Sequence, residues 1–269
     1  MNKIQLFIRY LKNDRIKEYE AIIKSALYKD YEIISLRDYI EDNYDNTKKL
    51  MILRHDLDQL SNGAKMMYSM EKKYNVKSSF YFRNSTYDPK LIKEIEAYGS
   101  EASLHFEPIA DFVKANNIKN KKELYSFTDW EQKCLNILKA NLERYRNLLN
   151  IPCSTIASHG EYENTLVETA NNHLTENTKT YNFLNIKLEA YNKEMIEKVT
   201  AYISDVPLEI TDGYKYGTTP FEAIARDEKF IIFLSHPNHW HYSLWKQFKK
   251  LVKTIIRPQD FVVTKFKRI

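Results

Sequence analysis

Short apolar runs alternate along this chain with longer segments whose apolar residues recur at helical spacing. Within residues 64–74, for example, Ala64, Met67, Met70 and Tyr74 recur every three or four positions. The predicted strands are 31–34, 50–53, 79–82, 101–104, 154–157, 231–234 and 261–263, and the predicted helices are 17–27, 64–74, 89–98, 130–149 and 242–255. This alternation predicts a parallel sheet, either open or closed as a barrel.

Length and composition indicate one globular domain. A chain of 269 residues can bury a large single core, and no repeat or low-complexity linker divides it. We therefore expect one domain over 1–269, in which residues 1–30 either belong to the barrel or form an N-terminal helical cap. The content of 43% hydrophobic and 29% charged residues excludes disordered and fibrous classes. The net charge of +5 comes from scattered basic residues, so no nucleic-acid partner is expected.

Targeting signals and cysteines point to a cytoplasmic protein. The amino-terminal apolar region is too short for a signal peptide, and no small-residue cleavage site follows it. No stretch approaches the roughly 20 apolar residues that span a membrane. Cys134 and Cys153 form no metal-binding pattern, and we expect both to be reduced.

Two carboxylates follow the apolar strand predicted at 50–53. Because alternate side chains of an extended chain share a face, Asp56 and Asp58 point the same way. Like charges at the end of a buried strand repel, and a bound cation or a shared proton relieves that repulsion. The alternative is a pair of solvated loop acids.

The histidines favour the functional interpretation. Six of the seven lie at or just beyond the carboxyl end of a predicted strand. These are His55, His105, His159, His236, His239 and His241. Parallel barrels place their active sites at that face, so most of these side chains are expected to line a common site.

These residues carry a family resemblance. The run Arg-His-Asp-Leu-Asp at 54–58 resembles the first motif of the polysaccharide deacetylases, the NodB-like carbohydrate esterases, in the branch with Asp-x-Asp. Residues 78–83, 99–107, 202–205 and 234–237 resemble the later motifs in order, and the likeness runs from about residue 30 to about residue 245. The resemblance implies a distorted (β/α) barrel, often of seven strands, and metal-dependent removal of an N- or O-acetyl group from a sugar.

The resemblance also implies roles for individual residues. Asp56 falls on the catalytic base, Asp58 on the metal-binding aspartate and His105 on the first metal-binding histidine. His236 falls on the general acid, and Asp205 is expected to orient it or to tune its charge. A mixed set of imidazole and carboxylate ligands favours zinc over magnesium.

The chain departs from the family pattern at the second metal histidine. That position is Ile109, and Ser100 replaces the histidine that usually follows the glycine. His159, at the end of the next strand, is the first candidate for the missing ligand, and Glu107, which shares a strand face with His105, is the second. Otherwise the site binds metal weakly or not at all, and the protein is a catalytically silent carbohydrate-binding relative.

Other residues near the motifs leave two interpretations open. Arg83 either pairs with Asp56 or Asp58, or binds an anionic substrate. Trp240 either stacks on a sugar ring or packs within its loop. His55 is expected to pack beneath the site, since it alternates away from the carboxylates.

The absence of an export signal bears on the substrate. We expect a nucleotide- or lipid-linked acetylated amino sugar, used in surface-polysaccharide synthesis, or an oligosaccharide. The alternative within enzymes is hydrolysis of another non-peptide C–N bond.

Overall fold

A curved sheet of parallel strands forms the centre of the computed structural model, which describes residues 14–177, 179–206 and 213–241. Seven strands follow one another in the order β6-β5-β4-β3-β2-β8-β7, every ladder is parallel, and β1 pairs beside the first half of β2. The strands are β1 (Tyr31–Ile34), β2 (Lys49–Leu57), β3 (Ser79–Phe82), β4 (Glu101–Phe106), β5 (Thr155–Ser158), β6 (Leu188–Glu189), β7 (Ala201–Ser204) and β8 (Phe230–Ser235). The predicted fold, a distorted (β/α) barrel with seven strands, is confirmed.

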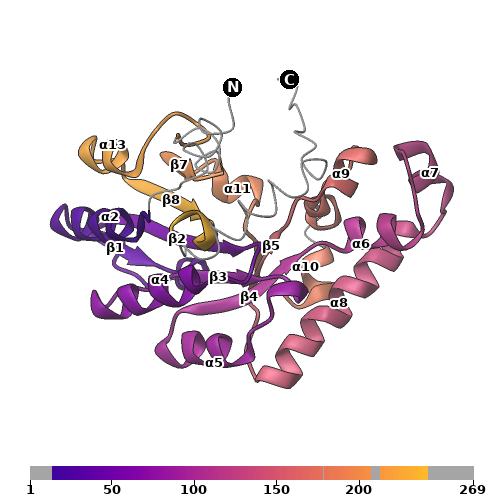
Figure 1. The fold of residues 1–269 in the computed structure, drawn as a ribbon, viewed down its shortest axis with the longest axis horizontal. Helices are drawn as coiled ribbons and strands as arrows, with labels where there is room; N and C mark the ends of the chain where they lie inside the picture. The colour runs from indigo at the N-terminus through magenta and orange to yellow at the C-terminus, as the bar shows by residue number, and fades with distance from the viewer. Residues whose placement is uncertain (1–13, 178, 207–212, 242–269) are drawn as a thin grey trace, which may run out of the picture.

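Helices surround the sheet, and Figure 1 shows α2, α4, α5 and α8 along its outer side. The α-helices are α2 (Ile16–Tyr28), α3 (Leu36–Ile40), α4 (Asn62–Lys73), α5 (Pro89–Tyr98), α6 (Pro108–Ala115), α7 (Lys121–Ser126), α8 (Trp130–Leu149), α9 (Tyr162–Leu166), α10 (Lys179–Leu184), α11 (Lys193–Ile196) and α13 (Pro220–Ala225). The described residues also form the 3₁₀ turns η1 (Asn84–Thr86), η2 (Asn171–Thr175) and η3 (Pro237–His239). Among the described residues, no helix is both long and apolar enough to cross a membrane.

Local sequence signals set several of these boundaries. The Asp88 side chain accepts a hydrogen bond from the Leu91 backbone N–H, and Pro89 occupies the first turn of α5. The same helix ends at Gly99, whose φ of 92° is in the left-handed region that glycine adopts readily. The predicted helix at 89–98 therefore matches α5.

Six predicted strands correspond to β1, β2, β3, β4, β5 and β8, whereas β6 and β7 were not predicted as strands. β6 has only two residues and shows no periodicity that a sequence pattern could reveal. The predicted helix at 242–255 and the predicted strand at 261–263 lie outside the described residues.

Helix α2, the described part of the possible N-terminal cap at 1–30, packs against the barrel. Tyr19, Ile22 and Ile23 of α2 are fully buried in one apolar cluster that also contains Leu53 of β2 and Phe233 of β8. Removing these side chains from water stabilises the contact of α2 with the sheet. Because all the strands are parallel, their carboxyl ends meet at one edge, where the chemistry-bearing residues gather.

Candidate active site

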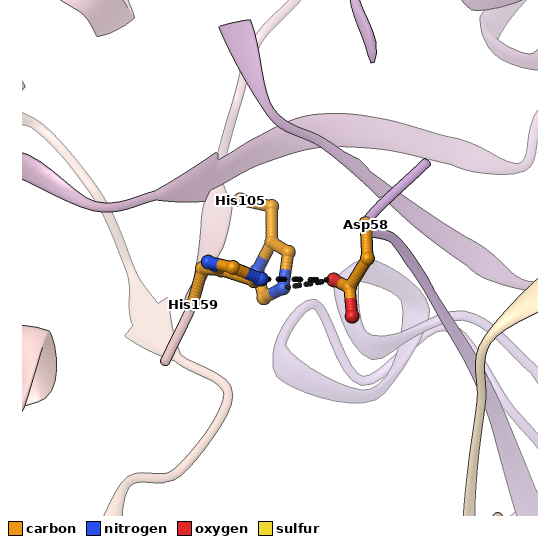
Figure 2. A group of neighbouring side chains, drawn as sticks. All are labelled: Asp58, His105 and His159. Carbon is orange, nitrogen blue, oxygen red and sulfur yellow. Dashed lines mark ion pairs between the residues drawn. The ribbon is translucent and has the colours of Figure 1, made fainter. Parts of the chain in front are cut away.

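One carboxylate and two imidazoles converge at the carboxyl ends of three strands (Figure 2). Asp58 follows β2, His105 lies near the end of β4 and His159 follows β5. The Oδ1 atom of Asp58 lies 3.3 Å from His105 Nε2 and 3.2 Å from His159 Nε2. The two rings meet edge to face, with centroids 4.9 Å apart. One ligand atom from each residue therefore faces a common point, as a metal site requires.

The Oδ1 atom of Asp58 is buried, yet among the described residues it accepts no hydrogen bond. Burial by itself would raise the pKa of Asp58, but the neighbouring imidazoles of His105 and His159 outweigh it and lower that pKa. Asp58 is therefore an anion at neutral pH. A buried anionic oxygen that faces two imidazole nitrogens at 3.2 and 3.3 Å, outside hydrogen-bond geometry, fits a divalent cation.

The second nitrogen of His105 is held by a hydrogen bond, and that of His159 faces a carboxylate. His105 Nδ1 lies 2.9 Å from the carbonyl oxygen of Ala157, and since a carbonyl only accepts, Nδ1 carries the proton and leaves the Nε2 lone pair for a ligand bond. His159 Nδ1 lies 3.3 Å from Glu107 Oε2. Burial would lower the pKa of His159, but Asp58 and Glu107 outweigh it and raise the pKa to about 9.

Glu107 lies behind His159 rather than beside Asp58. Its carboxylate pairs with the Arg83 guanidinium, whose Nε is 3.0 Å from Glu107 Oε1. Arg83 also pairs with Glu161, and its Nη1 reaches the carbonyl oxygen of Asp58 at 3.4 Å. The structure thus brings His159 to the Asp58 carboxylate, while Arg83 pairs with neither the Asp56 nor the Asp58 carboxylate.

Arg54, to which the sequence pattern assigned no role, holds a second carboxylate of the site. The Arg54 guanidinium contacts Asp56 in two places, with Nε to Oδ1 at 2.9 Å and Nη2 to Oδ2 at 2.7 Å. The ring of Tyr191 lies 4.2 Å from that guanidinium. Burial would raise the pKa of Asp56, but the charge of Arg54 outweighs it and the pKa is lowered. The spacing in the sequence could have indicated this pair, because Arg54 and Asp56 lie two residues apart on one strand and therefore share a face.

An Asp–His pair lies on the other side of Asp58. His236, which follows β8, places Nδ1 2.6 Å from Asp205 Oδ1, and its backbone N–H donates to Asp205 Oδ2 at 2.8 Å. Burial would lower the pKa of His236, but the Asp205 carboxylate outweighs it and raises the pKa to about 9. His236 Nε2 lies 3.8 Å from Asp58 Oδ2, so a protonated nitrogen faces the site.

Trp240 does not lie where a sugar-stacking ring would be. Its side chain is fully buried, and the indole N–H donates to Asp205 Oδ2 at 2.7 Å. Of the two interpretations that the sequence left open for Trp240, sugar stacking does not agree with this burial, because the ring has no exposed face. Loop packing, the other interpretation, describes its position.

The remaining strand-end histidines separate from the cluster. His55 points away from the carboxylates, as expected, and bonds to Glu71 and Ser235 in the interior. His239 lies behind His236, with Nδ1 3.4 Å from Asp205 Oδ2, and His241 pairs with Asp14. The tertiary structure thus places three of the six histidines, His105, His159 and His236, around Asp58.

Glu189, at the end of β6, is a buried carboxylate that the sequence did not reveal. It accepts hydrogen bonds from the backbone N–H groups of Ser158 and Tyr191, and burial raises its pKa to about 7. It thereby ties the end of β5, directly before His159, to β6. A two-residue strand offers no pattern from which this position could be found.

No protein-family model and no curated protein matches this chain. Solved structures that resemble it include BA3943 from Bacillus anthracis, described as a CE4 family pseudoenzyme, at 12% identity over 77% of this chain and 61% of that one, with a TM-score of 0.42. The chitin deacetylase of the fungal pathogen Colletotrichum lindemuthianum is 13% identical over 76% of this chain and 81% of its own, with a TM-score of 0.38. The polysaccharide deacetylase Bc1974 from Bacillus cereus is 15% identical over 78% and 88%, with a TM-score of 0.41. The chain spans about three fifths of the length of BA3943. Two of these three structures are named as deacetylases, and the third is described as a pseudoenzyme.

Proposed function

We propose that this protein is a metal-dependent carbohydrate deacetylase, which hydrolyses an N-acetyl or O-acetyl group on a sugar. The observation that carries the proposal is the arrangement around Asp58. Its carboxylate faces His105 and His159, while Asp56 lies on one side and His236 on the other. Asp56 Oδ2 is 3.5 Å from His105 Nε2, and His236 Nε2 is 3.8 Å from Asp58 Oδ2. A base, a metal-binding cluster and an acid are thus within reach of one small reacting group.

Asp58, His105 and His159 would hold the ion. Two imidazoles and one carboxylate suit zinc and leave a position open for water or substrate. When bound, a divalent ion lowers the pKa of a water molecule and polarises an acyl carbonyl. The buried Asp58 oxygen without a hydrogen bond supports this fit.

The proton transfers would fall to Asp56 and His236. Arg54 keeps Asp56 ionised, so that this carboxylate can accept a proton from the attacking water. His236 is protonated at neutral pH and can donate its Nε2 proton to the leaving amine or hydroxyl. Asp205 holds the other ring nitrogen and stabilises the cation until that transfer.

The substrate we propose is an acetylated amino sugar carried on a nucleotide or a lipid, or within an oligosaccharide. Hydrolysis of another non-peptide C–N bond would use the same groups, and the released product distinguishes the two activities. The cytoplasmic location stays a prediction from the sequence.

The test measures acetate release and bound zinc together. Zinc-loaded protein is incubated with nucleotide-linked, lipid-linked and oligomeric N-acetylhexosamines. Asp56→Asn should abolish acetate release and keep the ion, whereas Asp58→Asn should lose both. Asp129→Asn, a change at an exposed carboxylate, serves as the control.

Two results would contradict the proposal. Failure of the native chain to bind zinc would remove the metal-dependent mechanism. Zinc binding without acetate release from any of these sugars would leave the silent carbohydrate-binding protein as the better description. The buried Ile109 at the family's second metal position is the observation that favours this second candidate.

A further inference from the structure

We propose that Trp240 is a positioning residue, whose indole N–H fixes the Asp205 carboxylate and through it the orientation of His236. The kinetic part of this inference rests on the proposed function. The geometric part concerns only the hydrogen bonds around Asp205.

Asp205 is completely buried, and its two oxygens have different partners. Oδ1 is 2.6 Å from His236 Nδ1, whereas Oδ2 accepts from the His236 backbone N–H at 2.8 Å and from Trp240 Nε1 at 2.7 Å. A carboxylate turns about its bond to Cβ unless both oxygens are held. The indole N–H, the shorter of two side-chain contacts to Oδ2, holds this oxygen in the plane in which Oδ1 meets the His236 ring; the other contact is His239 Nδ1 at 3.4 Å.

The indole is itself fixed from the outer helix layer. Its ring packs edge-on against Tyr19 of α2 and against Phe233 of β8, both with centroids 5.8 Å away. The Trp240 carbonyl accepts a hydrogen bond from the Arg15 backbone N–H at 2.9 Å. Tyr19 in turn donates its hydroxyl to Glu71 of α4 at 2.5 Å. The indole that contacts Asp205 is therefore held by α2 and, through Tyr19, by α4, and this arrangement needs no substrate.

The metal-binding half of the site is held by other groups. His105 is oriented by the Ala157 carbonyl, His159 Nδ1 lies 3.3 Å from Glu107 Oε2, and neither contact involves Trp240. Removal of the indole N–H should therefore disturb the acid and leave the ion-binding cluster intact. A general loss of folding would disturb both.

The experiment replaces Trp240 by 3-benzothienylalanine through nonsense suppression. This residue keeps the bicyclic shape and replaces the N–H by sulfur. The same replacement of Trp130, a buried tryptophan in a separate apolar cluster, is the control, and Trp240→Phe is a second variant. The measurements are kcat and KM for acetate release, bound zinc, and the downfield proton resonance of the His236 Nδ1–H.

We expect kcat to fall about 10-fold or more, as for other groups that orient a working histidine, with KM and zinc content unchanged. The His236 resonance should move in both Trp240 variants and stay in place in the Trp130 control. Native kcat together with an unmoved resonance would overturn the inference. If the native chain releases no acetate, the proposed function fails, and the resonance alone then decides the role of Trp240.

Discussion

Arg54 and Asp56, two residues apart on β2, form a bidentate ion pair in which each side chain is only 2% exposed. Two opposite charges so deeply buried stabilise the fold only as a pair, because either one alone would lack a partner in a medium of low dielectric constant. This relationship has consequences for stability as well as for catalysis.

Arg54→Met should therefore lower the free energy of unfolding by roughly 3–5 kcal/mol. Adding Asp56→Leu to that variant should restore most of the loss, since apolar side chains replace buried ion pairs at little cost. Urea denaturation of both variants measures the effect. A double variant that is less stable than Arg54→Met would contradict this account of the pair.

Glu107 is expected to orient His159 without binding the ion itself. Glu107→Gln should keep one zinc ion per chain but weaken the zinc affinity about 10- to 100-fold. The reason is that a neutral amide would replace the carboxylate that faces Nδ1 of the ligand His159. Glu161→Gln is the matched control, since this carboxylate also pairs with Arg83 but lies 3.8 Å from His159 Nδ1. Zinc titration with a competing chelator gives the affinities. Complete loss of the ion in Glu107→Gln would instead make Glu107 a ligand.

The raised pKa values of His159 and His236 predict how stability varies with pH. In the ion-free protein both pKa values are about 9, which is above the pKa of roughly 6.5 of a histidine in the unfolded chain. The protonated rings therefore stabilise the fold fully below about pH 6.5, and this contribution is lost as the pH rises through 9. The free energy of unfolding, measured with chelator present, should decrease between these values.

His236→Asn should make this decrease in the free energy of unfolding smaller, because one of the two histidines with a raised pKa is then absent. Bound zinc should also reduce the decrease with pH, since a metal-bound His159 is already neutral. Stability that rises between pH 6.5 and 9 in the ion-free native chain would show that neither imidazole is protonated in the fold.

Gly63 allows α4 to approach the turn that follows His236. A Cβ atom at this position would lie 2.1 Å from the Pro237 carbonyl oxygen, which is far inside contact distance. Gly63→Ala should therefore cost about 1–3 kcal/mol of stability, as overpacking usually does. Gly160→Ala is the control, since nothing lies within 4 Å of its Cβ position. Thermal or urea unfolding compares them, and equal stability of the two variants would rule out a tight contact.

The sequence alone determined the parts of this protein that depend on local periodicity. The apolar run of β2 predicted a buried strand, and the period of two placed Asp56 and Asp58 on one face, opposite His55. The parallel alternation then placed His105, His159 and His236 at one edge of the sheet. These inferences needed no knowledge of which strands are neighbours.

The tertiary structure decided which side chains from different strands and helices come into contact. Strand pairing and curvature brought His159, rather than Glu107, to Asp58. Packing against α2 buried Trp240 and turned its N–H toward Asp205, and the side-chain order along β2 gave no sign of either contact. The physical reason is that periodicity fixes the face a side chain takes, whereas its partner depends on residues distant in the sequence that only the folded sheet and its helices bring near.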